Sequence, residues 1–181
     1  LISPGLPNEA IRLGEVFGRM MNYGDGLYGG QFVGGMYAAD FFEHDIEQII
    51  QAGLDCVPKA RQFHERISDV ISWTRQYPND WETAWRLVNA KYNLDKDYRK
   101  ASCTGEHAHF NIDAKINAAY IVMGLLYGKR DIDQTVIIST RCGEDSDCNP
   151  SNAAGVLCTT MGYSNIPERF TSALDRTQHF S

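Results

Sequence analysis

The residue types best suited to chemistry stand together in residues 141–150, RCGEDSDCNP. Asp145 and Asp147 are one residue apart and follow a glycine, so an extended turn would let both carboxylates point the same way. Carboxylate pairs of this kind suit hard, oxygen-preferring cations such as magnesium, calcium or manganese. The small residues at 151–157 predict a helix, whose positive N-terminal end favours anionic side chains. The pattern indicates a metal site, with a simple helix N-cap as the alternative.

Helices are the elements that must position this turn, because apolar residues recur at helical spacing along most of the chain. About seven to nine helices of average length, and hence an all-α fold, are expected. The β-branched run 135–138 also fits a strand, but its acidic start and helical neighbours favour a helix. Residues 23–30 are interpreted as a glycine-rich loop, and 91–106 as a polar surface connection. The expected helices cover 31–42, 45–53 (closed by a glycine cap), 59–76, 81–88, 113–127 and 132–139, with one beginning at Pro7 and one near Pro150.

Length and charge narrow the class of protein. A chain of 181 residues with 43% hydrophobic residues fits one domain with a real core. The net charge of -6 and the lack of a basic patch argue against binding to nucleic acid or to an anionic membrane surface. No apolar run approaches the roughly 20 residues that a membrane span needs.

Cysteine usage favours free thiols in a reducing compartment, because five is an odd number and the spacing forms no tight framework. Zinc is an alternative that would draw its ligands from the cysteines and nearby histidines. These lack the short paired spacing typical of zinc sites. The residues concerned are Cys103, His107, His109, Cys142 and Cys148.

A calcium loop is the other metal alternative, since Asp145, Asp147 and Asn149 match the start of an EF-hand. That pattern then requires a glycine where Pro150 stands and a bidentate glutamate where Val156 stands. Both requirements fail, so the sequence disfavours this type of loop.

The turn at 143–149, the small-residue helix after it and a later Gly162…Ile166-Pro167 together resemble the C-terminal motif of the ADP-ribosylglycohydrolase family. Three further stretches look like the same family and occur in the same order. The resemblance extends from about Pro4 to Pro167. These stretches are Asp25-Gly26-Leu27-Tyr28-Gly29-Gly30, Asn117-Ala118-Ala119, and Leu125-Leu126-Tyr127-Gly128 before Asp131.

The resemblance implies an orthogonal multi-helix bundle around a magnesium-dependent site, binuclear in the family and open to manganese, that releases ADP-ribose from an acceptor. Asp145 and Asp147 carry over as metal ligands. The family usually has a hydroxyl ligand where Cys148 stands, and a thiol is a poor partner for magnesium. Either Asn149, a backbone oxygen or water is then expected to take that place, or the site is altered. Without a cation, one of the two aspartates is expected to have a raised pKa, because close like charges repel.

The family's other half-site is a Thr-Asp-Asp cluster with a glutamate near the N-terminus, and the chain contains no Thr-Asp-Asp. The chain also opens on Leu1 without an initiator methionine. We therefore expect residues 1–181 to be the C-terminal portion of a larger domain, with half a metal site, unassigned catalytic residues and no turnover alone. The missing segment, or a second copy, is expected to cover an exposed apolar face.

The resemblance also indicates how an ADP-ribosylated or ADP-ribose-like ligand is held. The glycine-rich stretch, through Asp25, Gly26, Tyr28 and Gly29, is expected to contact the nucleotide, and Tyr28 can stack on a base. Asn117 and Asn149 are expected near the substrate. The alternative is a catalytically inactive family member that acts as a binding or structural module, which Cys148 keeps open.

Overall fold

The computed structural model describes residues 2–174, and every regular element in that range is a helix. The expected all-α class is confirmed. Eight longer helices match the expected number, and two short ones, α6 and α10, exceed it. The α-helices are α1 (Pro7–Gly18), α2 (Asp25–Ala39), α3 (Ile46–Asp55), α4 (Gln62–Gln76), α5 (Trp81–Val88), α6 (Lys96–Lys100), α7 (Ala114–Gly128), α8 (Ile132–Arg141), α9 (Cys148–Met161) and α10 (Glu168–Thr171), with a π-helix η1 (Asn89–Asn93) and a 3-10 turn η2 (Tyr163–Asn165).

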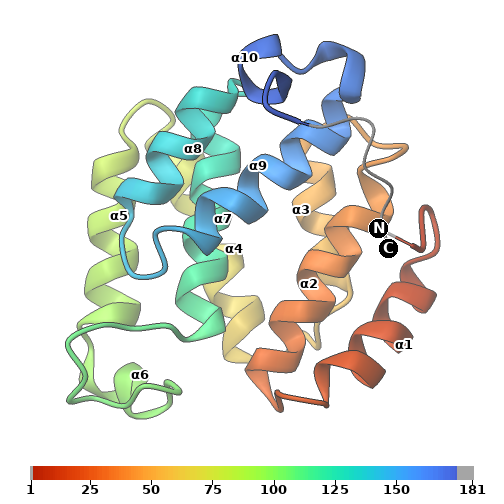
Figure 1. Ribbon diagram of the computed structural model, residues 1–181. Coiled ribbons are helices and arrows are strands. Elements are labelled where there is room, and N and C mark those ends of the chain that lie inside the picture. Colours follow the sequence, from red (N-terminus) through yellow and green to blue (C-terminus); the bar gives the residue numbers. More distant parts are fainter. Residues whose placement is uncertain (1, 175–181) are drawn as a thin grey trace.

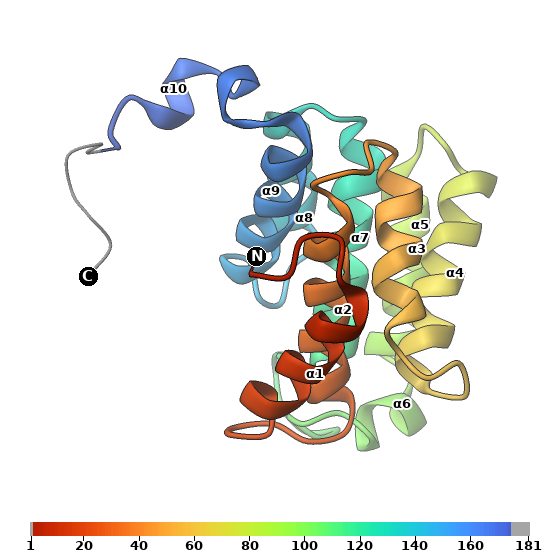
Figure 2. The same ribbon diagram turned by 90° about the vertical axis from the view of Figure 1, so that its right-hand side faces the viewer.

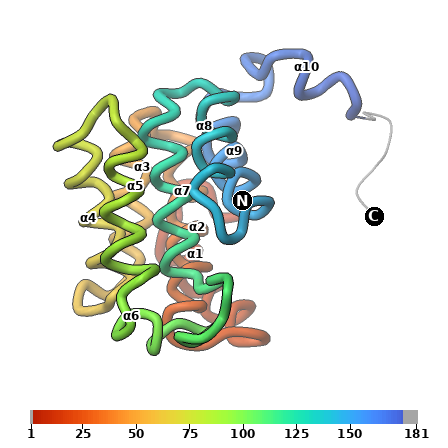
Figure 3. Tube along the Cα trace, turned by 90° about the vertical axis from the view of Figure 1, so that its left-hand side faces the viewer, coloured from red at the N-terminus to blue at the C-terminus, as the bar shows by residue number. Residues whose placement is uncertain are grey.

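Helix α7 forms the centre of the fold (Figure 1). It is apolar on all sides, and 13 of its 15 residues are buried. A helix without a polar face must be surrounded by other elements. Figure 3 shows α4 and α5 on one side of α7, with α8 and α9 on the other.

Aspartates begin five of the helices. Each accepts hydrogen bonds from backbone N–H groups of the first turn, which have no partner within the helix. Asp80 and Asp131 confirm the expected starts of α5 and α8. The capping residues are Asp45, Asp80, Asp95, Asp113 and Asp131.

Two expectations about glycines are wrong. The supposed loop at 23–30 is helical from Asp25 onward, after Gly24 at φ +56°. Gly53 is not a helix cap but an internal residue of α3, where a Cβ would lie 2.7 Å from the carbonyl oxygen of Phe32. Glycine weakens an isolated helix, but here its small size lets α2 and α3 approach closely, and that packing decides the structure.

The stretch 91–106 is more ordered than a surface connection. It includes the end of η1 and all of α6, and it buries Tyr92 and Arg99. The Arg99 guanidinium donates to the carbonyls of Ala108 and Phe110, which fixes the loop that follows α6. Figures 1 and 2 show α6 at the same end of the molecule as the connection between α1 and α2.

Helix α1 lies at the edge of the molecule (Figure 1), and apolar side chains of this helix and of the turn after it are exposed. Val16, Phe17 and Met20 are 55%, 62% and 78% exposed. Such a surface is expected to meet a partner, and the identity of that partner stays a prediction. Within residues 2–174, the helices are too short or too polar to cross a membrane.

Replacing Gly128 with alanine is expected to destabilise the fold by about 1–3 kcal/mol, the usual cost of overpacking. A Cβ there would lie 2.8 Å from the Cα of Thr135, at the contact of α7 with α8. Thermal unfolding measures the loss. Gly30→Ala is the matched control, because nothing lies within 4 Å of its Cβ and alanine favours a helix. Equal midpoints for the two variants would contradict this packing.

Candidate metal and substrate site

The turn between α8 and α9 has an unusual backbone. Gly143 and Glu144 have φ values of +95° and +59°, and a positive φ is uncommon for a residue other than glycine. Just before them, the Trp85 indole N–H donates to the carbonyl oxygen of Cys142 at 2.8 Å. Two left-handed residues in succession thus redirect the chain between the end of α8 and the start of α9 at Cys148.

Asp145, Asp147 and Cys148 come together at this turn, with their potential ligand atoms within 4.8 Å of one another. Among residues 2–174, they form the only group of three or more such side chains that could hold a metal ion. Cys103 and Cys142 do not belong to it, which removes the basis of the zinc alternative. Two carboxylates fit a hard divalent cation, and the thiol does not.

The charges at the turn shift two pKa values. The neighbouring Asp145 carboxyl and the backbone N–H groups at the start of α9 lower the pKa of Asp147. The raised pKa expected for one aspartate of the pair is therefore not found at Asp147. The Asp145 carboxylate, by hydrogen bond and by charge, raises the pKa of the Cys148 thiol. The thiolate that a soft metal would need is thus disfavoured here.

Asn117 supports the turn from the first part of α7. Its side-chain oxygen accepts from the backbone N–H of Asp145 at 3.2 Å and from Asn149 Nδ2 at 2.9 Å. Its amide nitrogen donates to the carbonyls of Asn111 and Asp113. Asn149 is 1% exposed, and its Oδ1 has no hydrogen-bond partner within the described part of the chain. Both asparagines therefore lie at the turn that carries Asp145, and Asn117 also donates to a carbonyl at the start of its own helix.

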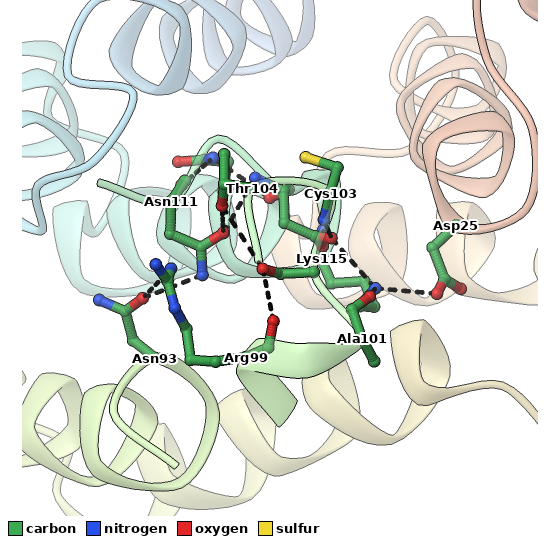
Figure 4. A network of polar contacts seen from close by, with 11 residues as sticks. Asp25, Asn93, Arg99, Ala101, Cys103, Thr104, Asn111 and Lys115 are labelled. Carbon is green, nitrogen blue, oxygen red and sulfur yellow. Dashed lines mark hydrogen bonds and ion pairs between the residues drawn. The ribbon is translucent and has the colours of Figure 1, made fainter. Parts of the chain in front are cut away.

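The glycine-rich stretch lies at the start of α2, where Asp25 meets a buried lysine (Figure 4). Lys115 Nζ donates to Asp25 at 2.9 Å, to Asp113 at 3.2 Å and to the carbonyl of Ala101 at 3.3 Å. The Lys115 side chain is 2% exposed. Burial of a cation requires such partners, so these contacts fix α2 against α7 and the loop after α6.

Two cavities open at this end. Asp25 and Gly26 line one of about 490 Å³, together with residues 100–103 and 112–115. Tyr28 lines a second of about 320 Å³, where the Arg61 guanidinium lies 5.7 Å from its ring centre. Gly29 instead lies against Ala114 and Phe63, as a packing position.

Helix α7 links the two groups of candidate residues, since Lys115 contacts Asp25 and Asn117 contacts Asp145. Lys115 is not among the site residues predicted from the sequence. Its signal was a lysine near the start of an otherwise apolar helix, which indicates a buried ion pair. Asn111 was not predicted either, because the sequence of a polar loop does not distinguish a buried asparagine from an exposed one.

Comparison with known proteins gives one match. The family model described as ADP-ribosylglycohydrolase matches residues 1–181, the whole chain. No curated protein matches the chain. No solved structure matches it either.

Proposed function

The chain belongs to the ADP-ribosylglycohydrolase family, whose members are hydrolases, and from this premise we propose that it takes part in cleaving an ADP-ribosyl bond with the help of magnesium. The observation that carries the proposal is the meeting of Asp145 and Asp147 at one turn, within 4.8 Å of each other and of Cys148. A helix N-cap alone would require only one of these carboxylates.

The donor set favours a hard cation. Asp145 and Asp147 would supply two charged oxygens, and the Oδ1 of Asn149, buried without a hydrogen-bond partner among the described residues, is a candidate for a third. Magnesium or manganese, when bound, supplies a Lewis acid that can hold vicinal ribose hydroxyls and orient a water molecule. Asn117 keeps the Asp145 backbone in place for this task.

The substrate is proposed to enter from the α2 side. The cavity of about 490 Å³ beside Asp25 and Gly26 is large enough for part of a nucleotide. Tyr28 offers an aromatic face, and the exposed Arg61 beside it offers positive charge for a phosphate. Glu144 is not proposed as the acid–base group, because both of its carboxylate oxygens accept hydrogen bonds from the protein.

The chain is proposed to hold part of the metal site rather than all of it. A hard divalent cation takes about six oxygens, and the group formed by the described residues offers two carboxylates. Calorimetry of the chain with magnesium and then ADP-ribose tests this. We expect weak magnesium binding without turnover of an ADP-ribosylated acceptor. Tight stoichiometric binding with turnover would show a complete site.

Cys148 supports a second candidate function, that of a binding module without catalysis, since a thiol stands where an oxygen ligand is expected. Replacing Cys148 with serine puts an oxygen donor in its place, and magnesium binding should become about tenfold tighter, the equivalent of one good charged contact. Cys158→Ser, at a half-buried site in the same helix, is the control. Unchanged magnesium binding by Cys148→Ser would favour the inactive module.

A further inference from the structure

Glu144 joins the aspartate turn to two other segments. Its Oε1 accepts from Asn93 Nδ2 at 2.7 Å, and its Oε2 accepts from the backbone N–H of Asn111 at 2.5 Å. Asn93 is the last residue of η1, and Asn111 lies in the loop between α6 and α7. We call these three residues the Glu144 bridge.

The bridge forms part of a closed ring of hydrogen bonds around the turn. Asn111 Nδ2 donates to Asn93 Oδ1 at 3.0 Å, and the Asn111 carbonyl accepts from Asn117 Nδ2 at 3.1 Å. Asn117 Oδ1 in turn accepts from the backbone N–H of Asp145, the residue after Glu144. The position of Asp145 is therefore fixed from both sides, by its own N–H and by the preceding side chain. Figure 4 shows Asn93 and Asn111 in contact beside Arg99.

Local structure on both sides of the contact is costly by itself. Glu144 has a φ of +59°, in the left-handed region, which is energetically unfavourable for a residue that has a Cβ. Asn93 ends a π-helix, a form that is rare and frequent at functional sites, and its extra residue shifts the side chains that follow. Such unfavourable backbones persist where surrounding contacts hold them. Here, the two meet in the same hydrogen bond.

We infer that Glu144 is a positioning residue that sets the Asp145–Asp147 turn for cation binding and ties it to the loop at 101–113. The inference rests on the proposed cation site. The loop also lines the cavity beside Asp25 through Ser102, Cys103 and neighbouring residues. The bridge therefore connects the wall of the candidate substrate cavity to the candidate metal ligands.

The donors around Glu144 make a carboxylate necessary. Both of its partners donate, so a glutamine at this position would direct its NH₂ at one donor. Asn93 could accept a hydrogen bond from this NH₂ only if its own side-chain amide rotated by half a turn. Its NH₂ group would then face Asn111 Nδ2 and Arg99 Nη1, which are also donors. Glu144→Gln is thus expected to lose a hydrogen bond to a charged acceptor and to weaken manganese binding about tenfold.

A second substitution separates geometry from charge. Asn93→Asp adds a negative charge near the cation, which by charge alone would tighten binding, but it sets two carboxylates against each other. The double variant, Asn93→Asp with Glu144→Gln, restores the contact with donor and acceptor exchanged. The glutamine at position 144 can donate to the aspartate at position 93 and still accept from the backbone N–H of Asn111. Asn89 now accepts from Asn93 Nδ2. Because Asn89 is half-buried, its amide can rotate and donate to the aspartate instead. Each single variant should bind manganese about tenfold more weakly, and the double variant within about threefold of the unsubstituted chain.

The experiment titrates manganese by electron paramagnetic resonance and measures hydrogen exchange at the Asn111 amide. Glu82→Gln, an exposed glutamate of α5, is the matched control and should change neither. In the absence of metal, hydrogen exchange at the Asn111 backbone amide should be faster in both single variants than in the unsubstituted chain. In the double variant it should be slow again. Tighter binding by Asn93→Asp, or losses that simply add in the double variant, would overturn the inference while leaving the cation site intact. Failure of the unsubstituted chain to bind manganese would overturn the site itself and the inference with it.

Discussion

Replacing Asp147 with asparagine is expected to weaken manganese or magnesium binding at least about 100-fold while leaving the metal-free fold intact. The proposed ligand charge disappears, and loss of a group that only supports a ligand already costs about 10–100-fold. Stability should change by less than about 0.5 kcal/mol, because the Asp147 side chain is exposed to solvent.

Thermal unfolding with and without metal separates the two roles of Asp147. The unsubstituted chain should gain stability as the cation is added, by mass action, and Asp147→Asn should not. Asp97→Asn is the matched control, with a side chain that is 92% exposed. A metal-free midpoint that falls as steeply as the affinity would show that Asp147 is a structural cap. Normal affinity in Asp147→Asn would remove this residue from the metal site.

The sequence was sufficient for the helical class because local signals agreed with one another. Asp80 and Asp131 cap the helices that their positions predicted, and the apolar run of α7 is buried as expected. The glycine-rich stretch was misinterpreted for a physical reason. Glycine disfavours a helix locally, but in α2 packing against neighbouring helices outweighs that preference, and a single sequence does not show the neighbour.

The candidate site was predictable in part. The spacing of Asp145 and Asp147 was enough to predict that they meet on a turn at the start of a helix, and they do. Their role as metal ligands stays a prediction. The side chains of Asn117, Asn93 and Trp85 hold the turn from 28, 51 and 57 positions away along the chain. Partners at such distances leave no local pattern, so only the fold identifies them.

Asp40 is a buried carboxylate in unfavourable surroundings. It follows the last turn of α2, is 1% exposed, and neither of its oxygens has a hydrogen-bond partner within the described part of the chain. Removal from water penalises its charged form and raises the pKa of Asp40 to about 7. A buried carboxylate without a partner makes folding unfavourable wherever it must ionise.

Asp40→Asn is therefore expected to stabilise the fold by roughly 2–4 kcal/mol at pH 8 and by almost nothing at pH 4. Between its ordinary pKa of 3.8 and about 7, the folded chain holds a proton that the unfolded chain has released, so stability falls as the pH rises through this window. Above pH 7, the free-energy cost of ionising the buried carboxyl is complete, and the asparagine variant never incurs it.

Denaturant unfolding of both proteins from pH 4 to 8 measures the difference in stability. Asp55→Asn, an exposed aspartate that ends α3, controls for a charge at a helix C-terminus. A gain that does not vary with pH, or that equals the gain of Asp55→Asn, would show that Asp40 keeps its charge in the folded chain at no cost.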